Sequence, residues 1–189
     1  MPLTKEFVQG LSALCEKYDA LLMVDEVQTG NGRCGTLYAY EQFGVTPDVV
    51  TTAKGLGGGL PIGATLFFEK TEKVLTAGMH GSTFGGNPIS CAAALSVLSR
   101  IDEKLLKEVR EKSELIFSSL QGAKGVKSVS GLGLMIGIET ENPVDEVLKR
   151  CMEKGILPIK AKSKLRLLPA LNIEKEVLKK AIEMLKECL

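Results

Sequence analysis

Two residues of opposite charge follow apolar runs of the sequence, and their types could do chemistry together. Asp25 ends the run Leu21–Val24, and Lys54 comes shortly after the β-branched run Val49–Thr52. A lysine amine can bond covalently to a carbonyl carbon, and an aspartate can hold a positive charge. Ligands of parallel α/β sheets bind beyond the carboxyl ends of the strands. We therefore expect both side chains at one such edge.

Each of these residues also has a purely structural interpretation. An aspartate at a strand end often caps a helix or joins a surface ion pair. A lysine at a strand exit can lay its methylene chain along apolar surface and keep its amine in water. Lys54 precedes its glycines rather than following them, so it does not fit a phosphate-binding loop of the GxxxxGK type, and a GxGxxG fingerprint is absent.

A carboxylate beside a buried strand needs a partner, because an unpaired buried charge costs on the order of several kcal/mol. Pyridoxal phosphate is a cofactor that uses both residue types. It needs a lysine amine for a Schiff base and an aspartate to keep its pyridine nitrogen protonated, and its ring then acts as an electron sink. On this hypothesis, the pyridinium is the positive partner of Asp25.

Two further stretches could bind anions. The segment HGSTFGGNP, residues 80–88, places hydroxyls and glycine amides just before an expected helix N-terminus, which favours phosphate or carboxylate. Arg166 in KLRLLPAL offers a planar fork that suits a carboxylate. A capped glycine-rich loop and an ordinary surface arginine are the alternatives. His80 has no nucleophile context nearby, and we interpret it as structural.

The order of elements predicts an α/β fold with a mostly parallel sheet, followed by a small α+β domain. Apolar spacing and capping residues predict helices over 5–18, 88–100, 103–121, 143–154 and 174–188. Apolar or alternating runs predict strands over 20–25, 49–52, 62–68, 126–130, 133–139, 156–159 and 164–168. We place the domain boundary at the end of the long helix, giving domains 1–101 and 102–189.

The composition excludes several classes of protein. The sequence is 44% hydrophobic and 25% charged with a formal net charge of +1, so nothing favours nucleic acid as a partner. No apolar run is long enough to cross a membrane. Five scattered cysteines never form a CxxC spacing, and one histidine makes a metal site improbable on chemical grounds. We expect a cytoplasmic protein with reduced thiols and no metal.

Three motifs in fixed order carry a family resemblance: LLMVDEVQTGNGRCG, TTAKGLGGGLPIGA and HGSTFGGNP. Together they resemble the class III aminotransferases, which are pyridoxal-phosphate enzymes of fold type I. The stretch YEQFGVTPDVVTTAKGLGGGLPIGA is most similar to the acetylornithine-specific branch of that family. The resemblance covers essentially the whole chain and implies a PLP-binding large domain, ending near residue 101, and a small C-terminal domain.

The resemblance implies roles for four residues around the cofactor ring. Lys54 matches the Schiff-base lysine, which also moves a proton during catalysis. Asp25 matches the aspartate that pairs with the pyridine nitrogen. Val27 is expected to pack on the ring face, and Gln28 to lie near the phenolic oxygen.

The resemblance also implies binding residues for phosphate and substrate. Thr83 matches a residue that binds the cofactor phosphate across a homodimer interface, and Ser82 one that touches substrate. Arg166 matches the small-domain arginine that receives a substrate carboxylate. The implied partners are an amino donor and a 2-oxo acid acceptor.

The implied reaction moves the δ-amino group of N-acetylornithine to 2-oxoglutarate. Family members are about twice as long as this chain, so we expect the chain to be the C-terminal half of the fold, without the main phosphate loop and a ring-stacking aromatic. A non-catalytic half-length paralogue or fragment that serves dimerisation or regulation is the alternative. Related ornithine and 4-aminobutyrate aminotransferases are alternatives within the enzyme class.

Overall fold

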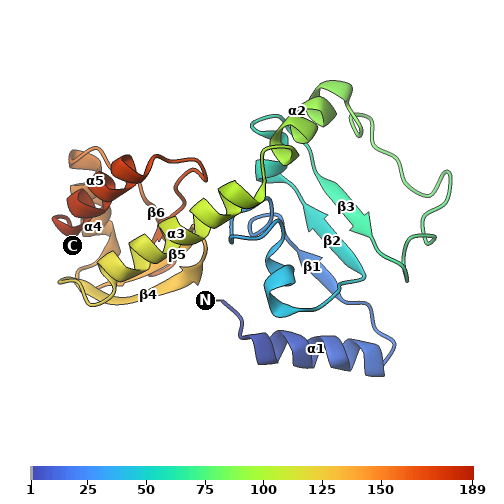
Figure 1. Cartoon of the computed structure of the whole chain (residues 1–189), viewed down its shortest axis with the longest axis horizontal. Helices are drawn as coiled ribbons and strands as arrows, with labels where there is room; N and C mark the ends of the chain where they lie inside the picture. Colours follow the sequence, from blue (N-terminus) through green and yellow to red (C-terminus); the bar gives the residue numbers. More distant parts are fainter. Residues whose placement is uncertain (1) are drawn as a thin grey trace. The chain divides into compact units, whose positions relative to one another are not determined.

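The computed structural model describes residues 2–189 and divides the chain into two compact units, Leu3–Glu103 and Lys104–Leu189. Figure 1 shows the elements of each unit in chain order. The division falls in the first turn of α3 (Glu103–Leu120).

The Leu3–Glu103 unit is built around a three-stranded sheet in the order β1-β2-β3. Its elements are α1 (Lys5–Lys17), β1 (Met23–Asp25), the 3-10 helix η1 (Ala39–Phe43), β2 (Val49–Thr52), the 3-10 helix η2 (Lys54–Gly57), β3 (Ala64–Phe67) and α2 (Pro88–Leu98).

Strand directions in this sheet are mixed. β1 and β2 run parallel, with Asp25 opposite Thr51, as the sequence predicts. β3 pairs with β2 antiparallel, so this part of the expected mostly parallel sheet is mixed. The connection from Thr52 to Ala64 contains only a short 3-10 turn, and a parallel return needs a longer crossover. The α/β fold class itself is confirmed.

Helix α1 forms as expected, but its apolar side is not covered. The Thr4 hydroxyl accepts a hydrogen bond from Phe7 N at 3.2 Å and so caps the first turn. No residue of α1 is buried, and Phe7 is 56% exposed. The other exposed apolar side chains of this segment are Leu3, Leu11, Leu14, Tyr18, Leu21 and Met23. The strand expected over 20–25 is shorter than predicted, because only Met23–Asp25 pairs with β2.

The Lys104–Leu189 unit combines a four-stranded sheet in the order β4-β5-β7-β6 with three helices. Its elements after α3 are β4 (Val126–Leu132), β5 (Met135–Thr140), α4 (Val144–Glu153), β6 (Ile159–Ala161), β7 (Lys164–Leu167) and α5 (Lys175–Lys186). Its neighbouring strands are all antiparallel, which fits the predicted α+β layer.

One face of this sheet packs against the helices and forms the main core. Ile136, Ile138 and Leu165 point to that face and are completely buried. They form one core cluster with side chains from all three helices. Ile116 of α3 and Val147 and Cys151 of α4 are fully buried, and Leu178, Ile182 and Leu185 of α5 are nearly so. The strand expected over 156–159 begins only at Ile159, because Pro158 has no N–H to donate to a ladder.

We expect the uncovered stripe of α1 to make the isolated chain self-associate, because contiguous exposed apolar surface favours contact with other apolar surface. Replacing Phe7→Ser together with Leu14→Ser should reduce the rise of the sedimentation coefficient with protein concentration. Val177→Ser on α5 is the matched control, since Val177 is also an exposed apolar side chain but lies in the other unit. A parent chain that is monomeric at every concentration would contradict this expectation.

Candidate active site at the carboxyl ends of β1 and β2

The parallel register of β1 and β2 brings Asp25 and Lys54 to the same edge of the sheet. Asp25 is the last residue of β1, and Lys54 is the second residue after the end of β2. Glu26 N donates to Thr51 O at 2.8 Å, so the parallel ladder continues one step beyond β1. The structure therefore places this predicted pair as the sequence analysis expected, at one carboxyl-terminal edge.

The carboxylate of Asp25 is exposed and already oriented. Its Oδ1 accepts a hydrogen bond from Val27 N at 2.9 Å, which fixes the plane of the carboxylate. Among residues 2–189, no hydrogen bond to its Oδ2 is found, so that oxygen can accept one from a bound group. Val27 and Gln28 lie in the turn directly after Asp25, where Val27 is half-buried and Gln28 is exposed.

Lys54 is exposed and sits on a strained backbone. Its φ of +48° is in the left-handed region, which costs a residue other than glycine about 1–2 kcal/mol. It opens η2, whose turn is closed by a 3.0 Å hydrogen bond from Leu56 N to Ala53 O. Strain of this kind persists only where the surroundings hold it in place, and it is frequent at active sites.

Helix α2 packs closely against the glycine-rich turn after Lys54. At Gly58, where φ is +58°, a Cβ would lie 2.8 Å from Cγ2 of Val97 on α2. Only glycine allows both this conformation and this approach. The helix thus supports the turn that presents Lys54.

Glu26 is the buried carboxylate of this region, and sequence reasoning did not single it out. It is 1% exposed, and its Oε1 accepts from Tyr40 N at 2.9 Å while its Oε2 accepts from the Thr29 hydroxyl. Gly30 N also donates to Glu26 O at 2.9 Å. Glu26 therefore organises the loop after Asp25 from within. Its position beside Asp25 is the one sequence signal that could have drawn attention to it.

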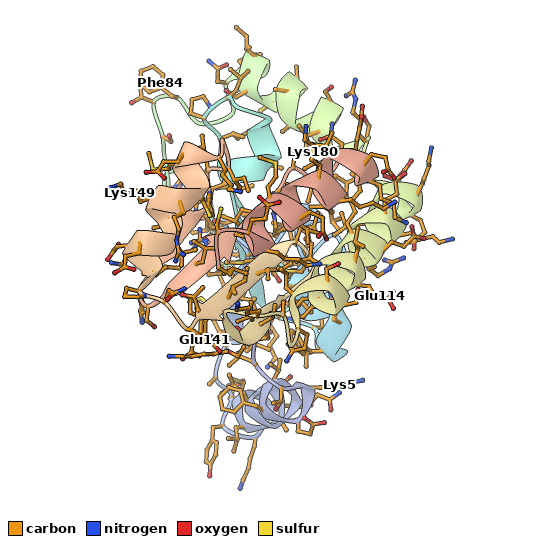
Figure 2. The ribbon with its side chains drawn as sticks, turned by 90° about the vertical axis from the view of Figure 1, so that its left-hand side faces the viewer. Lys5, Phe84, Glu114, Glu141, Lys149 and Lys180 are labelled. Carbon is orange, nitrogen blue, oxygen red and sulfur yellow. The ribbon has the colours of Figure 1, made fainter. Side chains whose placement is uncertain are left out.

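Ser82 and Thr83 lie in the exposed loop that leads into α2. Asn87 caps this helix as predicted, because its Oδ1 accepts from Ile89 N at 3.0 Å and from Ser90 N at 3.3 Å. Phe84, next to Thr83, is 83% exposed and projects from the ribbon (Figure 2). Within residues 2–189, neither Ser82 nor Thr83 makes a hydrogen bond to Asp25 or Lys54.

Arg166 belongs to the other unit, where it lies on the sheet face opposite to the core. In β7 it follows the buried Leu165 and pairs with Gly137 of β5 and Ile159 of β6. Its Nε is buried and has no hydrogen-bond partner among the described residues. On the same face, Lys164 Nζ donates to Ser130 Oγ at 3.0 Å. The unsatisfied guanidinium N–H suits a carboxylate.

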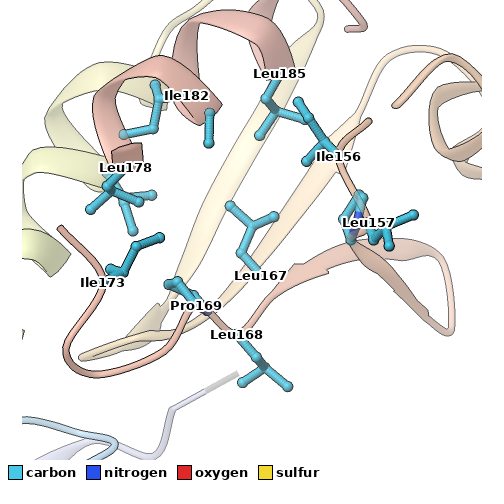
Figure 3. Close-up of a pocket in the computed structure, with 12 residues that line it drawn as sticks. Ile156, Leu157, Leu167, Leu168, Pro169, Ile173, Leu178, Ile182 and Leu185 are labelled. Atoms are coloured by element: carbon cyan, nitrogen blue, oxygen red, sulfur yellow. The ribbon is translucent and has the colours of Figure 1, made fainter. Parts of the chain in front are cut away.

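The Lys104–Leu189 unit also contains a groove of a different character (Figure 3). Side chains from β7, the loop after it and α5 converge on it, and all of the residues that line it are apolar. They are Ile116, Ile156, Leu157, Pro158, Leu167, Leu168, Pro169, Ile173, Leu178, Ala181, Ile182 and Leu185. Because no polar side chain lines this groove, it is poorly suited to orienting a charged cofactor or an amino acid.

The described residues contain no cluster of three or more histidine, cysteine or carboxylate side chains that could hold a metal ion. None of the helices that the structure describes is long and apolar enough to span a membrane.

Within residues 2–189, Asp25 is exposed with an Oδ2 that accepts no hydrogen bond, and Lys54 is exposed with no hydrogen bond or ion pair to its amine. A pyridinium nitrogen and a carbonyl carbon are the groups that a carboxylate and an amine can bind. The hydroxyls and glycine amides of 82–86 are the type of donors that a phosphate needs. These residue types match the chemistry of pyridoxal phosphate, and together with the α/β fold they point to the class of pyridoxal-phosphate enzymes.

Comparison with known proteins gives the family. A model of the class-III aminotransferases matches residues 1–189, and the chain belongs to this family. Acetylornithine aminotransferase of Haemophilus ducreyi is 48% identical over 189 residues, which is 99% of this chain and 48% of that enzyme. Membership of the family implies pyridoxal phosphate as the cofactor.

Solved structures agree with this assignment. The structure of N-acetylornithine aminotransferase from Stenotrophomonas maltophilia has a TM-score of 0.89 and 32% identity, covering 100% of this chain and 52% of that one. Plasmodium falciparum ornithine δ-aminotransferase has a TM-score of 0.88 and 34% identity, covering 98% and 50%. The chain therefore spans about half the length of the relatives it matches.

The buried thiol of Cys34 should make the free energy of unfolding depend on pH. Burial raises the pKa of its thiol to about 11, the Glu26 carboxylate raises it further, and Arg33 opposes the rise. Because this pKa lies above the ordinary value of 9.0, the folded chain holds the proton more tightly than the unfolded chain. The stabilisation is complete below pH 9.0 and is lost as the pH rises towards about 11.

We expect Cys34→Ala to flatten the decline in the free energy of unfolding over this alkaline range, measured by denaturant titration at several pH values. Cys15→Ala, at a half-buried position of α1, is the control and should keep the decline of the parent. An equal decline in the Cys34→Ala variant would show that another group causes it.

Proposed function

We propose that the chain forms the cofactor-binding part and the small domain of a pyridoxal-phosphate aminotransferase. The proposed reaction moves the δ-amino group of N-acetylornithine to 2-oxoglutarate, giving N-acetylglutamate semialdehyde and glutamate. The observation that carries the proposal is the placement of Asp25 and Lys54 at one edge of the sheet by the parallel register. The 48% identity to an acetylornithine aminotransferase supports the choice of substrate.

Pyridoxal phosphate, when bound, supplies an electron-withdrawing ring that stabilises negative charge on the carbon bearing the substrate amine. In the proposal, Lys54 Nζ is the point of covalent attachment and later carries a proton from that carbon. Asp25 Oδ2 would accept a hydrogen bond from the protonated pyridine nitrogen, while its Oδ1 stays hydrogen-bonded to Val27 N. Val27 packs on the ring, and Gln28 lies near the phenolic oxygen.

The other proposed site residues bind the cofactor phosphate or the substrate. Thr83 binds the cofactor phosphate across a homodimer interface, and Ser82 contacts substrate. The guanidinium of Arg166 receives a substrate carboxylate, a role supported by its unsatisfied buried Nε. Residues 1–101 would be the end of the cofactor-binding domain and 102–189 the small domain, in a cytoplasmic enzyme.

Covalent labelling tests the proposal directly. The chain is combined with the part of the Haemophilus ducreyi enzyme that it does not match, exposed to pyridoxal phosphate, and reduced with borohydride. Peptide mapping should find the pyridoxyl group on Lys54, because its amine is exposed at the proposed site. Lys54→Ala should lose the label, whereas Lys70→Ala, a control at another exposed lysine, should keep it. A label at a different lysine in the parent would overturn the assignment.

An ornithine aminotransferase is the second candidate within the family, because Plasmodium falciparum ornithine δ-aminotransferase matches the fold with a TM-score of 0.88. Comparing N-acetylornithine with ornithine as amino donors, in the same combined protein, distinguishes the two.

A non-catalytic half-length protein is the alternative outside the enzyme class. The observation behind it is that the chain spans about half the length of its relatives. Spectral titrations of the isolated chain and of the combined protein with pyridoxal phosphate, taken together, separate it from the proposal. We expect weak or no binding by the isolated chain and saturable binding by the combined protein. Failure of the combined protein to bind would support the non-catalytic alternative.

A further inference from the structure

Asn31 connects the two halves of the proposed site, although sequence reasoning gave it no role. It lies in the loop after Asp25, is 5% exposed, and has a φ of +56°. Its Nδ2 donates to Thr52 Oγ1 at 3.0 Å and to Ala53 O at 3.1 Å. Both acceptors belong to the two residues that precede Lys54. Within the sequence, Gly30-Asn31-Gly32 signals only a turn, so these contacts could not be predicted.

The Ala53 carbonyl is the acceptor that matters for Lys54. It shares a planar peptide group with Lys54 N, so fixing the carbonyl restricts rotation on both sides of that plane. Rotation about the Lys54 N–Cα bond is the φ angle that is held at +48°. Ala53 O also accepts from Leu56 N at 3.0 Å. Among residues 2–189, Asn31 therefore supplies the only side-chain hydrogen bond to the Ala53–Lys54 peptide, and this peptide sets the direction of the Lys54 Cα–Cβ bond.

The side chain of Asn31 lies next to Gly55 of this turn. A Cβ on Gly55 would lie 3.6 Å from Asn31 Cβ, which is ordinary contact distance. On the other side, the loop is anchored by Glu26, which accepts from Tyr40 N and Gly30 N. Asn31 Oδ1 is buried without a hydrogen-bond partner among residues 2–189. Because an unmet buried acceptor is unfavourable, the donors on Nδ2 must be what holds the carboxamide there.

We propose that Asn31 is a positioning residue for Lys54. Its two hydrogen bonds hold the Ala53–Lys54 peptide so that Lys54 keeps its left-handed conformation and presents its amine at the edge where Asp25 lies. The inference rests on the proposed function only in taking Lys54 as the point of cofactor attachment. The simpler interpretation is that Asn31 merely tolerates the left-handed turn, in which case glycine would serve equally well.

Hydrogen exchange in the full chain without cofactor separates these interpretations. Asn31→Gly keeps the backbone freedom that a positive φ needs but removes the carboxamide. We expect the amides of residues 54–58 to exchange about fivefold faster in this variant, because the turn loses its side-chain anchor. Asn31→Asp, which tolerates the same φ and has no N–H donors, should behave in the same way. Melting temperatures of both variants verify that they remain folded.

Asn142→Gly is the matched control, because Asn142 Nδ2 also donates to a backbone carbonyl, that of Leu189, in the other unit. It should leave exchange at 54–58 unchanged. In the combined protein, the rate of Lys54 labelling by pyridoxal phosphate and borohydride should fall about tenfold in Asn31→Gly and stay at the parental rate in Asn142→Gly.

Parental exchange and parental labelling in Asn31→Gly would overturn the positioning role and leave Asn31 as a turn residue. If the parent itself is not labelled at Lys54, the proposed function is wrong, whereas the exchange result still decides whether Asn31 holds the Lys54 turn.

Discussion

The parallel pairing of β1 with β2 is the constraint on which the candidate site depends. Because parallel strands end at the same edge, the register Asp25 opposite Thr51 places a carboxylate and, three residues beyond Thr51, a lysine on neighbouring strand ends. Hydrogen bonds then fix the loop that follows Asp25: Tyr40 N donates to Glu26, and Asn31 Nδ2 donates to Ala53 O. A slip in the register would separate the two groups even if every side chain were kept.

Sequence reasoning succeeded where local signals and burial agree. Thr4 and Asn87 begin their helices as predicted, and the strand of Val49–Thr52 forms because its β-branched side chains suit a buried strand. It failed where the answer depends on contacts between distant segments. The antiparallel direction of β3 could not be read from its composition.

The candidate site shows the same limit. The residue types of Asp25, Lys54 and Arg166 indicated their chemistry, and the family motifs indicated their roles. The burial of Glu26 and the two hydrogen bonds of Asn31 depend on how a glycine-rich loop folds over the end of β2. Asn31 and Lys54 both have positive backbone φ angles, which residues of these types adopt only occasionally. No sequence rule therefore predicts this arrangement.

The central claim is that Asp25 and Lys54 act on one cofactor ring. Nitrogen-15 NMR of labelled pyridoxal phosphate in the combined protein tests it most directly, because the chemical shift of the pyridine nitrogen reports its protonation. The account predicts a protonated nitrogen in the parent and in Asp19→Ala, an exposed control, and a deprotonated nitrogen at mildly alkaline pH in Asp25→Ala. An unchanged, protonated nitrogen in Asp25→Ala would contradict the account.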